Sequence, residues 1–137
     1  MLRYTAHSKQ KFDGVFAYAL SKRAQVELAK HMHLQLQKHQ YTIDVQSIHP
    51  GWADTPGVES GLKNFHTKMS KKLRTSDQGA QPTEWLSCLP PLDSSYFWFD
   101  WAPRSPYLLG KRPTQSTIDD LWTMVCEGAS LSRDWIS

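Results

Sequence analysis

The sequence predicts an α/β domain, and three patterns along its 137 residues carry that prediction. A long segment with helical apolar spacing is followed by an alternating segment that stops at Pro50-Gly51. An aromatic-rich segment then precedes a second segment with helical spacing. Apolar residues three and four positions apart indicate helices, whereas alternation that ends at turn residues indicates strands. A chain of this length forms at most one domain.

The first helix is expected over residues 14–38, with Asp13 as its N-cap. One stripe of apolar residues should face the core: Ala17, Leu20, Ala24, Leu28, Met32 and Leu36. His31 and His33 lie only two positions apart on this helix, so their side chains should diverge. We therefore expect no metal site there, and the other histidines have no partners at ligand spacing.

A strand is expected over residues 42–48, ended by Pro50-Gly51. Residues 52–77 contain further turn signals and a short amphipathic pattern, which predicts a loop that bears a helix. Its apolar face should be formed by Leu62, Phe65, Met69 and Leu73. Its basic side, which we expect to be solvated, consists of Lys63, Lys68, Lys71, Lys72 and Arg74.

Three more elements complete the expected fold. A helix should occupy residues 76–89, begun or interrupted by Pro82 and ended by Pro90, with Trp85 and Leu89 as core contacts. A strand should occupy residues 96–101. A helix should occupy residues 117–128, capped by Ser116, with acidic residues in its first turn and a frayed tail after it. Its inward side chains should be Ile118, Leu121, Trp122 and Val125.

Composition excludes several classes of protein. The net charge is only +3, which argues against a dedicated nucleic-acid binder, and no run of 18 apolar residues provides an integral membrane segment. The first residues lack the apolar stretch of a signal peptide, so we expect a cytoplasmic protein. Cys88 and Cys126 are expected to be ordinary buried thiols, and the six tryptophans are expected to pack in the core.

The residues that carry chemistry begin with Tyr18 and Lys22 on the first helix. Their spacing of four places the phenol and the ammonium on one face, away from the apolar stripe. A nearby positive charge favours phenolate, so we expect the pKa of Tyr18 to be lowered and the tyrosine to exchange a proton with a carbonyl oxygen. The spacing alone is weak evidence, because Tyr107 and Lys111 repeat it in a loop.

The residues that follow make the pattern specific. A long helix carries Tyr18-Ala19-Leu20-Ser21-Lys22, a strand follows, and the strand ends in His49-Pro50-Gly51-Trp52-Ala53-Asp54-Thr55-Pro56-Gly57. This order resembles the C-terminal half of a short-chain dehydrogenase/reductase over about residues 12–114. The resemblance implies an incomplete Rossmann-like domain: the second half of a doubly wound parallel sheet.

The resemblance also implies roles for particular residues. Tyr18 would be the catalytic acid/base, and Lys22 would hold the nicotinamide ribose. Pro50 and Gly51 would shape the backbone beside the nicotinamide, and Thr55 would bind its carboxamide or a phosphate. The implied cofactor is NAD or NADP, which supplies the hydride, and the implied substrate is a small lipophilic carbonyl compound or alcohol. Residues 52–74 would close over this substrate as a lid, through Leu62, Phe65 and Met69.

The chain departs from the family pattern before the first helix. Its glycines form no GxG, so the glycine-rich turn that cradles phosphates has no counterpart, and the catalytic serine is missing unless Thr5 replaces it. We therefore expect a single partial domain over 1–137 that lacks the dinucleotide-binding half. Two functions stay open: a truncated NAD(P)-dependent oxidoreductase, or a catalytically silent truncated relative that acts as an interaction module. Open sheet edges predict a homo-oligomer or an aggregate.

Overall fold

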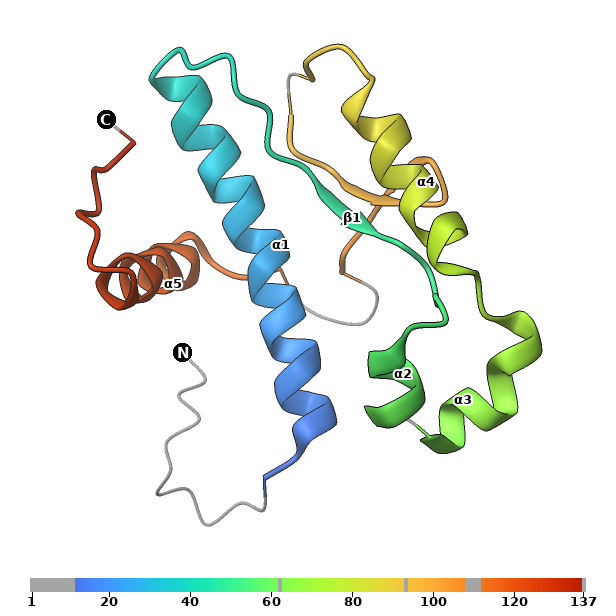
Figure 1. Cartoon of the computed structure of the whole chain (residues 1–137). Helices are drawn as coiled ribbons and strands as arrows, with labels where there is room; N and C mark the ends of the chain where they lie inside the picture. The colour runs from blue at the N-terminus through green and yellow to red at the C-terminus, as the bar shows by residue number, and fades with distance from the viewer. Residues whose placement is uncertain (1–11, 62, 93, 108–111, 137) are drawn as a thin grey trace.

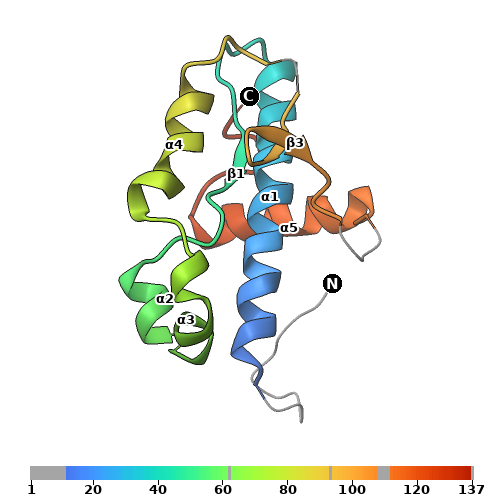
Figure 2. The same cartoon turned by 90° about the vertical axis from the view of Figure 1, so that its right-hand side faces the viewer.

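A computed structural model describes residues 12–61, 63–92, 94–107 and 112–136. Within them, helices and strands follow one another in this order: α1 (Gly14–Lys38), β1 (Ser47–His49), α2 (Pro56–Gly61), α3 (Lys63–Met69), the 3-10 helix η1 (Ser70–Lys72), α4 (Ser76–Ser87), β2 (Phe97–Phe99), β3 (Ala102–Arg104) and α5 (Gln115–Gly128). The α/β class is confirmed. Helices α1 and α4 lie on opposite sides of a small sheet (Figure 1, Figure 2).

The sheet is mixed, which corrects the expected parallel arrangement. Its strand order is β1-β2-β3; β1 pairs with β2 in parallel, and β2 pairs with β3 antiparallel. The single strand expected over 96–101 is therefore a hairpin. Asp100 and Trp101 form its tight turn with φ of 51° and 56°, and two successive residues of positive φ match the right-handed twist of a hairpin.

The strand expected over 42–48 is reduced to β1 (Ser47–His49), because a side chain replaces the preceding backbone pairing. The Gln46 Oε1 atom accepts hydrogen bonds from the Tyr96 backbone N–H, at 2.7 Å, and from Trp98 Nε1, at 3.0 Å. Its amide donates to the Ser94 carbonyl at 2.8 Å. These bonds give hydrogen-bond partners to the backbone groups of Ser94 and Tyr96, so the strand pairing need not continue before Ser47.

Helix α1 has the expected bounds. The Asp13 Oδ1 atom accepts from the backbone N–H of Val15 at 2.9 Å and of Phe16 at 3.0 Å, as an N-cap does. The predicted apolar stripe is only partly right, because Leu36 is buried but Leu20 and Ala24 are half-buried. The fully buried positions also include polar side chains that the stripe did not contain: Glu27, His31 and His33.

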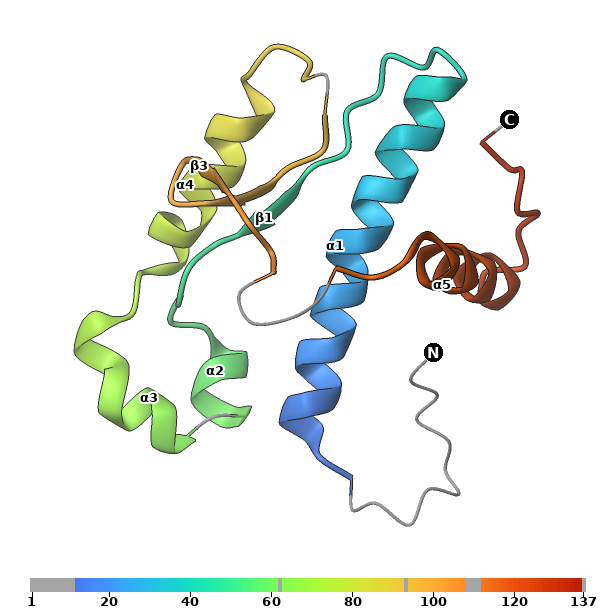
Figure 3. The same ribbon diagram turned by 180° about the vertical axis from the view of Figure 1, so that it is seen from behind.

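The buried apolar cluster of the described residues joins α1, α5 and the tail after α5. It comprises Leu36, Trp122, Cys126 and Ile136. Helix α5 crosses α1 on the side away from the sheet (Figure 3). After α5, Ser130 has φ of 56° and the Leu131 N–H donates to the Cys126 carbonyl at 2.9 Å, a helix ending that reverses the chain. The tail, expected to fray, therefore returns and buries Ile136 to 5% exposure.

Several local expectations need correction. Thr114, not Ser116, caps α5, so its acidic residues fall beyond the first turn. Val125 is exposed, whereas Cys126 packs inward as predicted. Cys88 is an exposed thiol. Pro82 lies buried inside α4, which begins with a capping box formed by Thr75 and Gln78. Only two tryptophans are buried, Trp98 and Trp122, while three are largely exposed: Trp52, Trp101 and Trp135.

Candidate active site

Tyr18 and Lys22 lie one turn apart on α1, as their spacing requires. The Lys22 ammonium is 5.7 Å from the centre of the Tyr18 ring, and it also donates to Gln25 Oε1 at 3.2 Å. Tyr18 is 64% exposed, and within the described residues its hydroxyl makes no hydrogen bond. The helix thus offers a phenol and an ammonium side by side, both accessible to a ligand.

The second predicted group, the turn after β1, adopts a conformation that suits glycine. Gly51 has φ of 80°, in the left-handed region that other residues rarely occupy. Its backbone N–H donates to the His49 Nδ1 atom at 2.9 Å. The first turn of α4 packs against the same loop: a Cβ on Gly79 would lie 3.1 Å from the Ala53 Cβ. The positive φ favours glycine at position 51, and the close contact with Ala53 leaves little room for a side chain at position 79.

Arg74 organises this turn, a role that no sequence pattern predicted. Its Nη1 atom donates to the Pro50 carbonyl at 3.1 Å, and its Nη2 atom forms an ion pair with the Asp100 carboxylate. Its guanidinium carbon is 5.9 Å from the centre of the Phe99 ring. The assignment of Arg74 to a solvated basic face is therefore wrong, although the four lysines assigned with it are exposed.

Thr55 lies at the start of the segment that was expected to act as a lid. Its Oγ1 atom accepts from the Val58 N–H at 3.4 Å, and its carbonyl accepts from the N–H of Val58 and of Glu59, so Thr55 starts α2. His66 on α3 is 2.9 Å from Asp54, which ties the segment to its own beginning. The apolar face expected here is half-buried at Met69 and Leu73; the side chains of Leu62 and Phe65 lie outside the described residues.

The electrostatics of the turn centre on His49. Burial lowers the pKa of the His49 imidazole, the Arg74 guanidinium lowers it further, and the Asp100 carboxylate partly opposes both. The ring also makes edge contacts with Phe97 and Phe99, at 6.4 and 5.4 Å between ring centres. A neutral imidazole can accept the Gly51 N–H, so the low pKa and the turn conformation support each other.

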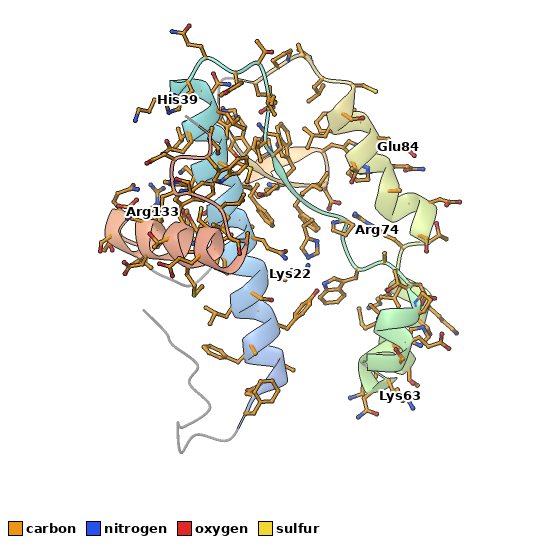
Figure 4. The ribbon with its side chains drawn as sticks, turned by 60° about the vertical axis from the view of Figure 1, so that its left-hand side comes forward. Lys22, His39, Lys63, Arg74, Glu84 and Arg133 are labelled. Atoms are coloured by element: carbon orange, nitrogen blue, oxygen red, sulfur yellow. The ribbon has the colours of Figure 1, made fainter. Side chains whose placement is uncertain are left out.

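The structure keeps the two predicted groups apart. Lys22 emerges from the side of α1 that faces the loop of Arg74 (Figure 4). Within the described residues, no hydrogen bond, ion pair or ring contact joins Tyr18 or Lys22 to Pro50, Gly51 or Thr55. Each group is formed by its own local contacts. Thr5 and Lys111 lie outside the described residues.

A separate cleft of about 330 Å³ lies at the other end of α1. It is lined by His31, Gln35, Lys38, Asp119, Trp122, Arg133 and Asp134. His31 stacks at a tilt on Trp122, with 5.0 Å between ring centres, whereas His33 approaches Asp44 at 3.2 Å. The two histidines diverge as predicted, and burial lowers the pKa of His31 while Asp119 partly opposes the shift.

Among the described residues, no three His, Cys, Asp or Glu side chains lie close enough together to form a metal-ligand set. No helix in the described part of the chain has both the length and the apolar character needed to cross a bilayer.

Comparison with known proteins gives two significant relatives with one description. The human protein named dehydrogenase/reductase SDR family member 12 is 40% identical over 100 residues, which is 71% of this chain and 30% of that protein. This chain is a partial homologue of the short-chain dehydrogenase/reductase superfamily. The bovine protein of the same name is 33% identical over 112 residues, or 80% of this chain and 34% of that protein.

The homology to the short-chain dehydrogenase/reductase superfamily confirms the resemblance inferred from residues 12–114. The chain spans about a third of the length of these curated relatives. No family model matches the chain. No solved structure matches it either. The fold is compatible with part of a Rossmann-like domain, since helices lie on both sides of a sheet with one parallel pair.

Proposed function

We propose that the protein is an NAD(P)-dependent oxidoreductase of the short-chain dehydrogenase/reductase type that acts on a carbonyl or alcohol group of a small lipophilic substrate. The observation that supports this most is the pairing of Tyr18 with Lys22: two accessible groups 5.7 Å apart on one helix face. The homology over most of the chain adds to it.

The residues present fit the nicotinamide end of such a cofactor. The Tyr18 hydroxyl has no hydrogen-bond partner within the described residues, and Lys22 has one neutral amide partner, so both can engage a ligand. The Pro50-Gly51 turn follows β1, and Arg74, which donates to the Pro50 carbonyl, lies across from Lys22 in Figure 4. The phosphate end has less support, because the chain contains no glycine-rich turn.

The proposed chemistry divides between cofactor and chain. The bound nicotinamide supplies or accepts the hydride. During reduction, the Tyr18 hydroxyl gives its proton to the substrate oxygen, and in the reverse direction it takes that proton back. Lys22 donates hydrogen bonds to the ribose. Pro50, Gly51 and Thr55 fix the position of the nicotinamide ring.

A turnover assay tests the proposal. Because the phosphate cradle is absent from the sequence, we expect weak dinucleotide affinity, and NADH and NADPH should be supplied at millimolar concentration with a panel of lipophilic ketones and aldehydes. Tyr18→Phe should lower turnover by about a hundredfold to ten-thousandfold, the usual contribution of a general acid. Tyr41→Phe is the matched control, because Tyr41 is an exposed tyrosine away from this site.

Lysine variants sharpen the assignment. Lys22→Met should lower turnover and weaken dinucleotide binding together, whereas Lys30→Met, at an exposed position on the same helix, should change neither. Absence of turnover by the unaltered chain at saturating cofactor would contradict the proposal. That result would favour the alternative, a catalytically silent interaction module. Its supporting observation is a pair of exposed aromatic side chains, Phe12 just before α1 and Phe16 in its first turn.

A further inference from the structure

We propose that Arg74 is a positioning residue for the proposed cofactor site, holding the Pro50-Gly51 turn in the conformation that receives the nicotinamide. The proposal rests on the function proposed above. It assigns a specific task to a residue that the family resemblance did not single out. Three sets of contacts carry it.

The first set lies on Gly51 itself. A Cβ added to Gly51 would fall 2.5 Å from the Arg74 Nη1 atom, 2.7 Å from Cζ and 2.9 Å from Nε. The guanidinium plane therefore covers the side of Gly51 on which any other residue would carry a side chain. The positive φ of Gly51 favours glycine, and the guanidinium in this position leaves no room for a Cβ beside it.

The second set fastens the residues on both sides of Gly51. Before it, the Pro50 carbonyl accepts from Arg74 Nη1 at 3.1 Å. After it, the Trp52 carbonyl accepts from the Arg74 backbone N–H at 2.8 Å, and the Asp54 N–H donates to the Arg74 carbonyl at 2.7 Å. Arg74 thus binds the turn through both its main chain and its side chain, and these bonds fix the direction of the backbone at Gly51.

The third set anchors Arg74 to the sheet. The Asp100 carboxylate accepts from Nη2 at the tip of the β2–β3 hairpin. A guanidinium can donate to a carboxylate and to a carbonyl simultaneously because its donors lie in one rigid plane, which a lysine ammonium cannot reproduce. The turn is consequently anchored to the β2–β3 hairpin through the Arg74 side chain.

The test compares Arg74→Lys with Arg104→Lys, a matched change at an exposed position on β3. Two readouts are needed: hydrogen exchange of the Gly51 amide without cofactor, and the KM for the dinucleotide in the turnover assay. Arg74→Lys should speed Gly51 exchange about tenfold and raise the KM about tenfold, with kcat within about twofold. Arg104→Lys should change neither.

A second variant guards against misfolding. Asp100→Asn removes the same ion pair at a position with φ of 51°, where asparagine is tolerated, and should shift both readouts in the same direction. Unchanged Gly51 exchange in both variants overturns the proposal. Faster exchange with an unchanged KM also overturns it, because Arg74 then only braces the fold. If the unaltered chain shows no turnover, the proposed function is wrong, and the positioning role of Arg74 is wrong with it.

Discussion

The substitution Gly51→Ala probes the turn beside the proposed nicotinamide site. Gly51 has φ of 80°, and an L-residue in the left-handed region costs about 1–2 kcal/mol. The new Cβ would also lie 2.5 Å from the Arg74 Nη1 atom, so the guanidinium must move away. That movement breaks its hydrogen bond to the Pro50 carbonyl and disturbs its pair with Asp100.

The magnitude follows from these two costs and one offset. A hydrogen bond that involves a charged group contributes about 1.5–3 kcal/mol, and the lower end applies because the Arg74 side chain is 28% exposed. Alanine also lowers the conformational entropy of the unfolded chain, which offsets the loss of stability by about 0.4–1 kcal/mol. We therefore expect Gly51→Ala to lower the free energy of unfolding by about 1.5–3 kcal/mol, on the sum of these contributions.

Urea unfolding followed by tryptophan fluorescence measures this difference. Gly128→Ala is the matched control, because a Cβ there meets nothing within 4 Å and Gly128 ends helix α5; its effect should stay within about 1 kcal/mol. Equal free energies of unfolding for the unaltered chain and Gly51→Ala would refute the reasoning, since the strain and the displaced guanidinium would then cost nothing.

Three further predictions concern the whole fold. Burial lowers the pKa of His31 and His49 in the folded chain. As the pH drops below 6.5, the ordinary pKa of histidine, the unfolded chain binds protons before the folded chain does, so the free energy of unfolding should fall. An equally steep fall in the double variant His31→Gln/His49→Gln would contradict this. Ile136→Ala should destabilise the fold by about 2–4 kcal/mol in urea titrations, against less than about 0.5 kcal/mol for the exposed Leu131→Ala. Light scattering after size-exclusion chromatography should show a dimer or larger species, because β1 pairs only with β2 among the described strands; a 15.8 kDa monomer would overturn that prediction.

Local signals were sufficient where a feature depends on near neighbours in the sequence. Helix α1 was predicted with its bounds and its cap, because twenty-five residues of helical spacing and Asp13 specify them locally. The Tyr18–Lys22 pair follows from the same helix geometry. Whether that pair acts on a substrate stays a prediction, because its role came from the family resemblance.

Long-range contacts account for what was missed. The hairpin turn at Asp100-Trp101 contains no glycine, so the sequence carries no signal for its positive φ values. Residues of β2 and β3 were therefore predicted as one strand. Arg74 was predicted on a solvated face because its partner Asp100 is 26 residues away. The buried Glu27 interrupts the apolar pattern, and its ion pair with Arg23 at 2.5 Å explains how the helix tolerates it.

Transfer of a label tests the central claim most directly. The protein should be incubated, at millimolar cofactor, with a lipophilic ketone and NADH or NADPH that carries deuterium at the reactive carbon of the nicotinamide, and the alcohol analysed by mass spectrometry. We predict that the unaltered chain and Tyr41→Phe both form deuterated alcohol. The yield of deuterated alcohol from Tyr18→Phe should be lower by about a hundredfold or more. Equal deuterium transfer by Tyr18→Phe, or none by the unaltered chain, would contradict the assignment of Tyr18 as the acid/base of an NAD(P)-dependent oxidoreductase.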